Sequence, residues 1–193
     1  MVKDGKIEKR PLILTMLAIF LFQAANMALL AYIIRLGIEY GLERDYVSTA
    51  LGLATWVALI GPGLVIVMGL KFGRFWPLLL VMGFTLAGTA LFHLSGQKWA
   101  FLRANCGTGI TWGMVIAYLL GMASQFDSTG RSAAAAGFVS KMGLARGPVV
   151  AGYMLTAGFS FGALLNAAFT VLVISTIVML IPAYILDKAR RKI

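Results

Sequence analysis

Residues 11–34 read PLILTMLAIFLFQAANMALLAYII, and none of these 24 residues is charged. A helix of about 20 apolar residues is long enough to cross the roughly 30 Å hydrocarbon core of a bilayer. Uncharged runs of similar length recur at residues 46–70, 75–97 and 104–126. This spacing predicts a membrane protein whose spans are helices.

The composition of the whole chain agrees with this prediction. Of its 193 residues, 60% are hydrophobic and only 12% are charged. A soluble domain carries about 25% charged residues. A surface with so much apolar area and so little charge would aggregate in water. The composition therefore excludes an ordinary soluble enzyme.

The last uncharged run, residues 147–186, is too long for one span. It contains Gly158-Phe-Ser-Phe-Gly162, and its two glycines predict a turn. The fifth span must then begin earlier and contain Lys141 and Arg146. The expected fold is all-α, with one six-helix transmembrane domain over residues 11–186, between a basic arm (1–10) and a basic tail (187–193). The expected spans are 11–34, 46–70, 75–96, 104–126, 133–157 and 163–186.

The net charge of +10 could indicate a nucleic-acid partner. We expect none, because the basic residues stand at span ends rather than on one soluble face. With six spans, eleven of the 17 basic residues fall on the side of the two termini. The positive-inside rule then predicts cytoplasmic termini in an inner-membrane protein. The eleven residues are Lys3, Lys6, Lys9, Arg10, Lys71, Arg74, Arg131, Lys188, Arg190, Arg191 and Lys192.

Sites for catalysis or for a metal are poorly supported by the sequence. The chain has one cysteine, Cys106, and one histidine, His93. Together they match no metal-site spacing, and we expect no metal and no cofactor. His93 and Ser95 are two apart on a helix, where side chains do not face each other. We therefore expect no enzymatic activity.

The fifth span carries a stripe of small residues and an unusual cation. Gly143, Gly147 and Ala151 recur every fourth residue, which lets two membrane helices approach closely. Pro148 should distort this helix. Arg146 is expected near the middle of the membrane, where a cation is costly and marks either a water-filled path or a paired partner.

Buried amides and aromatic side chains provide the candidate cavity residues. Gln23 and Asn26 share one face of the first span and either bond a neighbouring helix or line a cavity. Trp112 on the fourth span belongs either to a cavity or to the packed core. The six candidate cavity residues are Gln23, Asn26, Asn105, Trp112, Tyr118 and Arg146.

Four short motifs stand in order at the ends of the expected spans. They are Lys71-Phe-Gly73-Arg74, Arg103-Ala-Asn-Cys-Gly107-Thr-Gly109, Asp127-Ser-Thr-Gly130-Arg131 and Gly147-Pro148-Val-Val-Ala151-Gly152. In this order they resemble the motifs of the major facilitator superfamily of secondary transporters, whose turn after the second helix reads Asp-Arg-x-Gly-Arg. Leu70 stands where that turn has its acid.

The resemblance implies one half of a twelve-helix bundle whose two halves are parallel repeats. The basic arm and the missing acid resemble the C-terminal half. The implied function is alternating-access transport of a small organic solute, with a second six-helix half or a second copy as partner in the lipid bilayer. The alternative is a truncated inactive fragment or a structural membrane subunit. The implied cytoplasmic gating turns contain Lys71, Gly73, Arg74, Asp127 and Arg131.

Overall fold

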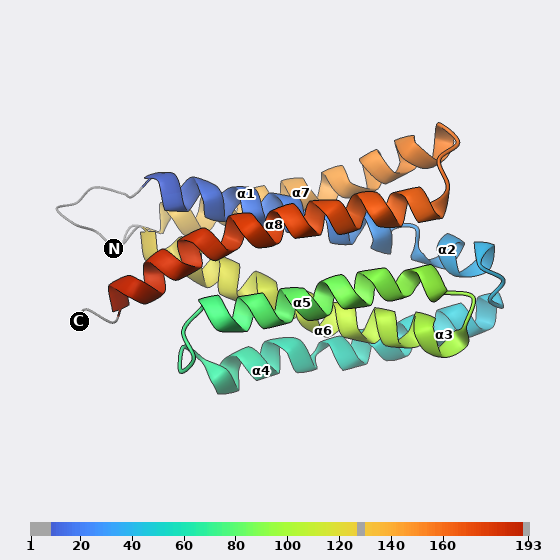
Figure 1. The fold of residues 1–193 in the computed structure, drawn as a ribbon, viewed down its shortest axis with the longest axis horizontal. Helices are drawn as coiled ribbons and strands as arrows, with labels where there is room; N and C mark the ends of the chain where they lie inside the picture. The colour runs from blue at the N-terminus through green and yellow to red at the C-terminus, as the bar shows by residue number, and fades with distance from the viewer. Residues whose placement is uncertain (1–8, 127–129, 191–193) are drawn as a thin grey trace.

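The computed structural model describes residues 9–126 and 130–190 of the chain. Every regular element in these two ranges is a helix, and Figure 1 shows the long helices running side by side along one axis. The first part of the chain forms α1 (Lys9–Leu30), α2 (Ile33–Glu39), α3 (Arg44–Ala58) and α4 (Ile60–Met68). The second part forms α5 (Phe75–Leu91), α6 (Lys98–Ala123), α7 (Arg131–Thr156) and α8 (Phe161–Arg190), with short 3-10 turns at Phe92–Leu94 and Ser124–Phe126.

Five helical segments among the described residues are long and apolar enough to cross a membrane. Their bounds are Lys9–Leu30, Arg44–Met68, Phe75–Leu94, Lys98–Phe126 and Phe161–Arg190. The all-helical fold is confirmed, and the length and composition of these helices suit a membrane protein. The sixth long helix, α7, is not among the five, and it carries Lys141 and Arg146 within its length.

The first two expected spans are each interrupted in the structure. The first ends at Leu30, and the chain continues as the short helix α2. The second is broken at Leu59 into α3 and α4. Pro62 is the third residue of α4, and a proline is tolerated only in the first turn of a helix, where its missing N–H costs nothing. The helix therefore restarts just before this proline.

The fourth expected span begins earlier than predicted, at Lys98 rather than at residue 104. The cations in this added turn lie against aromatic rings. The Lys98 ammonium is 5.2 Å from the centroid of the Tyr46 ring, and the Arg103 guanidinium is 5.4 Å from that of Trp99. Aromatic faces attract cations at such distances, so the charges do not end the helix at its expected start.

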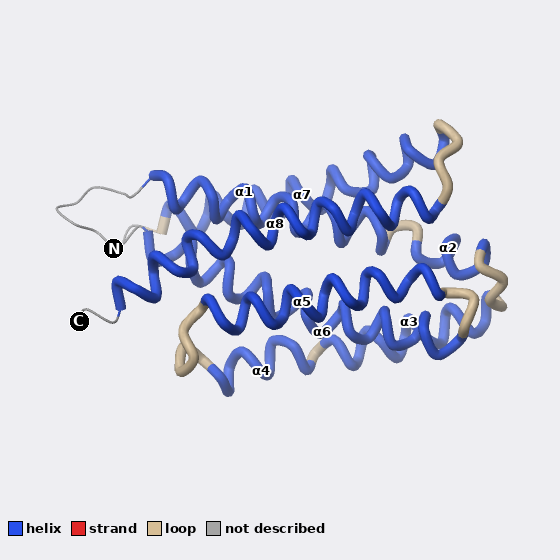
Figure 2. Tube along the Cα trace, viewed as in Figure 1, coloured by secondary structure: helices blue, strands red, loops and turns tan. Residues whose placement is uncertain are grey.

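The long helices pack in two groups. In the first group α1 runs along both α7 and α8, and in the second α6 packs against α3, α4 and α5. Figures 1 and 2 show the first group above the second in that view. The groups meet where α5 lies beside α8 and where α1 lies beside α6. The polar side chains with a candidate functional role lie at these two contacts.

The contact between α1 and α7 is made by the small-residue stripe. A Cβ atom on Gly143 would lie 2.7 Å from a backbone oxygen of α1, and one on Gly147 would collide with another. Ala151, on the same face, is fully buried. The carbonyl of Pro148 accepts a hydrogen bond of 3.4 Å from the Tyr32 hydroxyl. The stripe thus brings the two backbones into direct contact.

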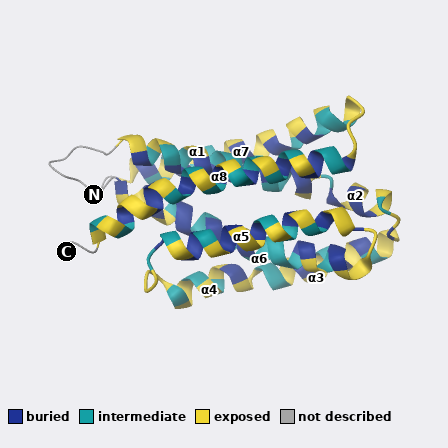
Figure 3. Ribbon diagram, in the orientation of Figure 1, coloured by how far each residue is buried: buried dark blue, intermediate teal, exposed yellow. Residues whose placement is uncertain are grey.

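Large apolar side chains also cover the outside of the bundle. Trp56, Ile66 and Phe84 are all strongly exposed, while Phe22 and Phe101 are fully buried between helices. Figure 3 shows buried and exposed residues alternating around each helix. Contiguous apolar surface of this kind marks a protein or membrane contact. The outer faces of the helices therefore suit a lipid environment.

Candidate functional site

A cavity of about 410 Å³ lies where α1, α2, α3 and α6 meet, and we call it the central pocket. Its volume is within the roughly 300–1,000 Å³ of small-molecule sites. Most of its lining is aliphatic. The polar or aromatic lining residues are Asn26, Thr55, Asn105, Thr108 and Trp112. An apolar wall with a few polar groups is the usual composition of a ligand site.

The two asparagines of the central pocket each have an unused acceptor. Asn26 Nδ2 donates a hydrogen bond of 2.8 Å to the Phe22 carbonyl, and Asn105 Nδ2 donates one of 2.8 Å to the Phe101 carbonyl. Neither Oδ1 atom accepts a hydrogen bond from a described residue. The pocket therefore offers two carbonyl oxygens to an occupant with N–H or O–H groups.

Trp112 is held in place by a hydrogen-bonded chain across three helices. Its Nε1 donates to Gln23 Oε1 at 2.6 Å, and Gln23 Nε2 donates to Ser140 Oγ at 2.8 Å. Gln23 is only 2% exposed, so it lies behind the pocket wall. Because the indole N–H is already bonded, Trp112 presents its ring to the pocket. We call Gln23, Trp112 and Ser140 the Gln23 centre.

The structure brings three of the six expected cavity residues to the central pocket: Asn26, Asn105 and Trp112. Tyr118 lies elsewhere, where its hydroxyl donates a hydrogen bond of 3.1 Å to the Gly69 carbonyl after α4. Arg146 is exposed on α7, two residues beyond the lining residue Leu144. Positions i and i+2 are about 200° apart around a helix, so Arg146 points away from the pocket.

Ser140 was not among the residues expected from the sequence. It stands three residues before Gly143 and seven before Gly147, on the face of α7 that meets α1. A polar residue on a small-residue stripe faces the partner helix at close range. The spacing of Ser140 from Gly143 and Gly147 is the sequence signal that could have identified it as a partner for a polar residue such as Gln23.

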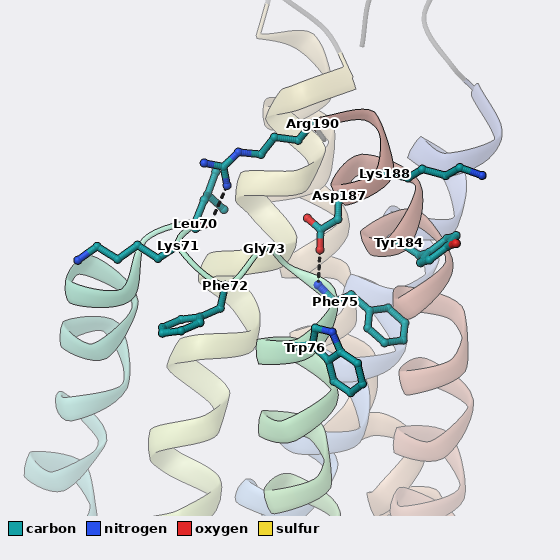
Figure 4. Close-up of a pocket in the computed structure, with 10 residues that line it drawn as sticks. All are labelled: Leu70, Lys71, Phe72, Gly73, Phe75, Trp76, Tyr184, Asp187, Lys188 and Arg190. Atoms are coloured by element: carbon teal, nitrogen blue, oxygen red, sulfur yellow. Dashed lines mark hydrogen bonds between the residues drawn. The ribbon is translucent and has the colours of Figure 1, made fainter. Parts of the chain in front are cut away.

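The turn between α4 and α5 is held by a carboxylate from α8. Asp187 Oδ2 accepts hydrogen bonds from the backbone N–H groups of Arg74 (2.7 Å) and Phe75 (2.9 Å). The Arg74 guanidinium lies 3.6 Å from Asp187 Oδ1 and is almost fully buried. A carboxylate at a helix N-terminus satisfies free N–H groups and opposes the positive end of the helix dipole. Asp187 therefore caps α5, and we call this arrangement the Asp187 centre (Figure 4).

Gly73 is required beside this carboxylate for two reasons. Its φ is +72°, in the region that residues with a side chain rarely adopt. A Cβ atom there would also lie 2.6 Å from Asp187 Oδ2. The carboxylate beside this turn thus comes from another helix, α8. The sequence alone had placed Asp187 only in a basic tail.

The second expected gating turn is described only in part. Asp127 lies outside the described residues, and Arg131 is exposed at the start of α7. Lys71 is exposed in the α4–α5 turn. A gating role for the two turns therefore stays a prediction.

No protein-family model matches the chain, and no curated protein sequence matches it. The fold and the site define its class: an all-helical protein with five candidate membrane spans among the described residues, a neutral pocket between its helices and a charged contact at one end.

Proposed function

We propose that the chain is one half of a secondary transporter of the major facilitator type, corresponding to a C-terminal half. It moves a small organic solute across the cytoplasmic (inner) membrane by alternating access. In this proposal α7 is the sixth span, and both termini are cytoplasmic. The observation that carries the proposal is the central pocket, which lies between candidate spans and combines apolar walls with neutral polar groups.

The lining of the central pocket favours a particular class of solute. The Oδ1 atoms of Asn26 and Asn105 accept hydrogen bonds, and the Trp112 ring offers its face to an apolar group or a cation. No lysine or arginine of the described residues lines this pocket. We therefore favour a neutral or cationic solute with N–H or O–H groups over the anion that Arg146 would have suited.

A second half is part of the proposal because one side of the central pocket is uncovered. Trp112 is 38% exposed, and the lining residues Leu30 and Ile34 are also exposed. Amide groups in contact with hydrocarbon are costly. A second copy of the chain, or another six-helix half related by an axis along the membrane normal, would close the pocket.

Cysteine labelling tests alternating access without knowledge of the solute. Cys106 is the single cysteine, so Cys106→Ser gives a background for Asn26→Cys and Thr55→Cys in the pocket. A membrane-impermeant thiol reagent is added to reconstituted protein from each side in turn. Alternating access predicts labelling from both sides.

The matched control for labelling is Leu80→Cys, on the exposed apolar face of α5. It should remain unlabelled from either side. Labelling of the pocket positions from one side only, or from neither, contradicts the proposal.

The mass of the purified chain in mild detergent tests the need for a second half. Light scattering, corrected for bound detergent, should show a dimer or a complex with a second six-helix chain. A monodisperse monomer would favour the alternative, a structural subunit or inactive fragment without transport of its own.

A further inference from the structure

A second and larger cavity, of about 790 Å³, lies at the end of the bundle where α1 begins and α8 ends. It is formed between the α4–α5 turn and the last turns of α8, and we call it the end pocket (Figure 4). Three cations line it: Lys71, Lys188 and Arg190. The proposed transport of a solute assigns no role to this cavity.

The end pocket has an excess of positive charge. Asp187, the one acid that lines it among residues 9–126 and 130–190, already faces the Arg74 guanidinium and accepts two backbone N–H groups. None of the three lining cations forms an ion pair with a described residue. The cations are therefore unmatched and suit an anionic ligand.

Arg190 is already positioned for such a ligand. Its Nη1 donates a hydrogen bond of 2.5 Å to the Leu70 carbonyl, which fixes the side chain across the mouth of the end pocket. A guanidinium has five N–H donors, so most of them remain for other partners. Phosphate oxygens accept such paired donors well. Lys71 and Lys188 extend to opposite sides of the pocket in Figure 4 and can approach on their flexible stems.

A layer of aromatic rings lies next to these cations, on the side nearer the middle of the bundle. Phe75 contacts Trp76 and Tyr184 edge to face, with ring centroids 5.5 Å and 6.1 Å apart. Figure 4 shows Phe75 and Trp76 toward the middle of the bundle, with Arg190 toward its end. Trp76 and Tyr184 are both more than half exposed. Trp and Tyr side chains gather at the level of lipid headgroups, which places the pocket at the membrane surface.

Two exposed apolar stripes continue from the aromatic layer toward the middle of the bundle. Trp76, Leu80 and Phe84 follow one face of α5, and Tyr184, Ile181 and Ile177 follow one face of α8. Their spacing of three or four residues keeps each stripe on one side of its helix. A water-soluble phosphate compound would leave these stripes unused, whereas two acyl chains would cover them.

We infer that the end pocket binds an anionic phospholipid. Its phosphate lies among Lys71, Lys188 and Arg190, and its acyl chains lie along the stripes of α5 and α8. Basic pockets between membrane helices are suited to anionic lipid headgroups. The site depends on the fold and on membrane insertion, and it is independent of whether the chain transports a solute.

Quenching of Trp76 by brominated lipids tests this inference. The substitutions Trp56→Phe, Trp99→Phe and Trp112→Phe leave Trp76 as the single tryptophan of the chain. The protein is reconstituted in phosphatidylcholine vesicles that contain a minor fraction of brominated phosphatidylglycerol or of brominated phosphatidylcholine. We expect apparent association at Trp76 to be at least about fivefold stronger for phosphatidylglycerol, since each nearby cation favours anionic lipid. Equal quenching by the two lipids would overturn the inference, and this comparison requires no change to the pocket.

Two charge-matched variants locate the effect. The pocket variant combines Lys71→Gln, Lys188→Gln and Arg190→Gln, and it should bring the preference for phosphatidylglycerol close to one. The control variant combines Arg35→Gln, Lys98→Gln and Arg103→Gln, which removes the same charge from the opposite end of the bundle. It should keep the full preference. An equal loss in both variants would show an effect of total charge and would overturn the site.

A soluble phosphate ester separates a lipid from a free ligand. Glycerol 3-phosphate is added at millimolar concentration to the vesicles with brominated phosphatidylglycerol. We expect the quenching of Trp76 to persist. Relief of the quenching would assign the end pocket to water-soluble phosphate compounds instead of a phospholipid.

Discussion

The Gln23 centre and the Asp187 centre both join distant parts of the chain, yet they use different chemistry. Around Gln23 the partners are an indole N–H and a hydroxyl, all neutral, between α1, α6 and α7. Around Asp187 the partners are a guanidinium and two N–H groups at the start of α5. The first centre lies beside the central pocket, and the second lies at the end of the bundle.

If the bundle spans a bilayer, as proposed, the difference follows from the cost of charge at each depth. A charged side chain near the bilayer centre is expensive, whereas one near the helix ends is within reach of water and headgroups. Neutral amides can join helices in the middle and still leave a pocket that a polar solute can enter. Charges at the end provide a stronger anchor, which suits a contact that holds a turn in place.

The largest expected effect comes from Asp187→Ala. The substitution leaves the guanidinium of Arg74, a residue that is 6% exposed, without its partner and removes the cap of α5. Loss of one member of a buried ion pair costs about 3–5 kcal/mol. We expect a decrease of this size in the free energy of unfolding, measured in mixed detergent micelles.

The control for Asp187→Ala is Glu39→Ala, at an exposed acid in α2. It should change stability by no more than about 0.5 kcal/mol. A loss below about 1 kcal/mol for Asp187→Ala would show that the charged centre is no stronger an anchor than the neutral one.

Gly147→Ala should have the next largest effect, because it separates the helices that meet at the Gln23 centre. The added Cβ would collide with backbone atoms of α1, which cannot move aside as a side chain can. Overpacking of this kind costs about 1–3 kcal/mol. Gly137→Ala on the same helix is the control, because its Cβ would meet nothing within 4 Å. Equal unfolding free energies for the two variants would contradict a direct backbone contact between α1 and α7.

Gln23→Leu should destabilise the fold less than either change, by about 1 kcal/mol, because hydrogen bonds between membrane helices are individually weak. It removes both hydrogen bonds of the Gln23 side chain. Combined with Trp112→Phe in a double-mutant cycle, it should show a coupling of about 0.5 kcal/mol or more. Additive effects of the two substitutions would mean that Gln23 does not position Trp112.

The smallest effect is expected for Arg190→Gln, an exposed residue beside the Asp187 centre. This side chain is exposed and makes one hydrogen bond to the described part of the chain. Its loss should change the free energy of unfolding by no more than about 0.5 kcal/mol. A loss of stability as large as that of Asp187→Ala would mean that the exposed Arg190 contact, rather than the Asp187 carboxylate, anchors the α4–α5 turn.

Much of the fold could be predicted from local features of the sequence. The spacing of charges indicated most of the long helices because charge is costly in a membrane span regardless of its neighbours. Gly143 and Gly147 indicated a close helix contact, since small residues on one face permit it whichever helix is the partner. The pocket residues Asn26, Asn105 and Trp112 were identified for a similar reason: polar groups on apolar helices need partners.

The partners themselves were decided by the tertiary structure. Trp112 bonds Gln23, 89 residues away in the sequence, and Asp187 caps a helix that begins 112 residues before it. Tyr118 and Arg146 were expected at a cavity, but Tyr118 instead holds the α4–α5 turn and Arg146 faces outward. Pattern along the chain determines how often and where it can cross a membrane. Which faces of the helices meet depends on how all the helices pack together, and only that packing places an acid from the last helix beside a turn that has none of its own.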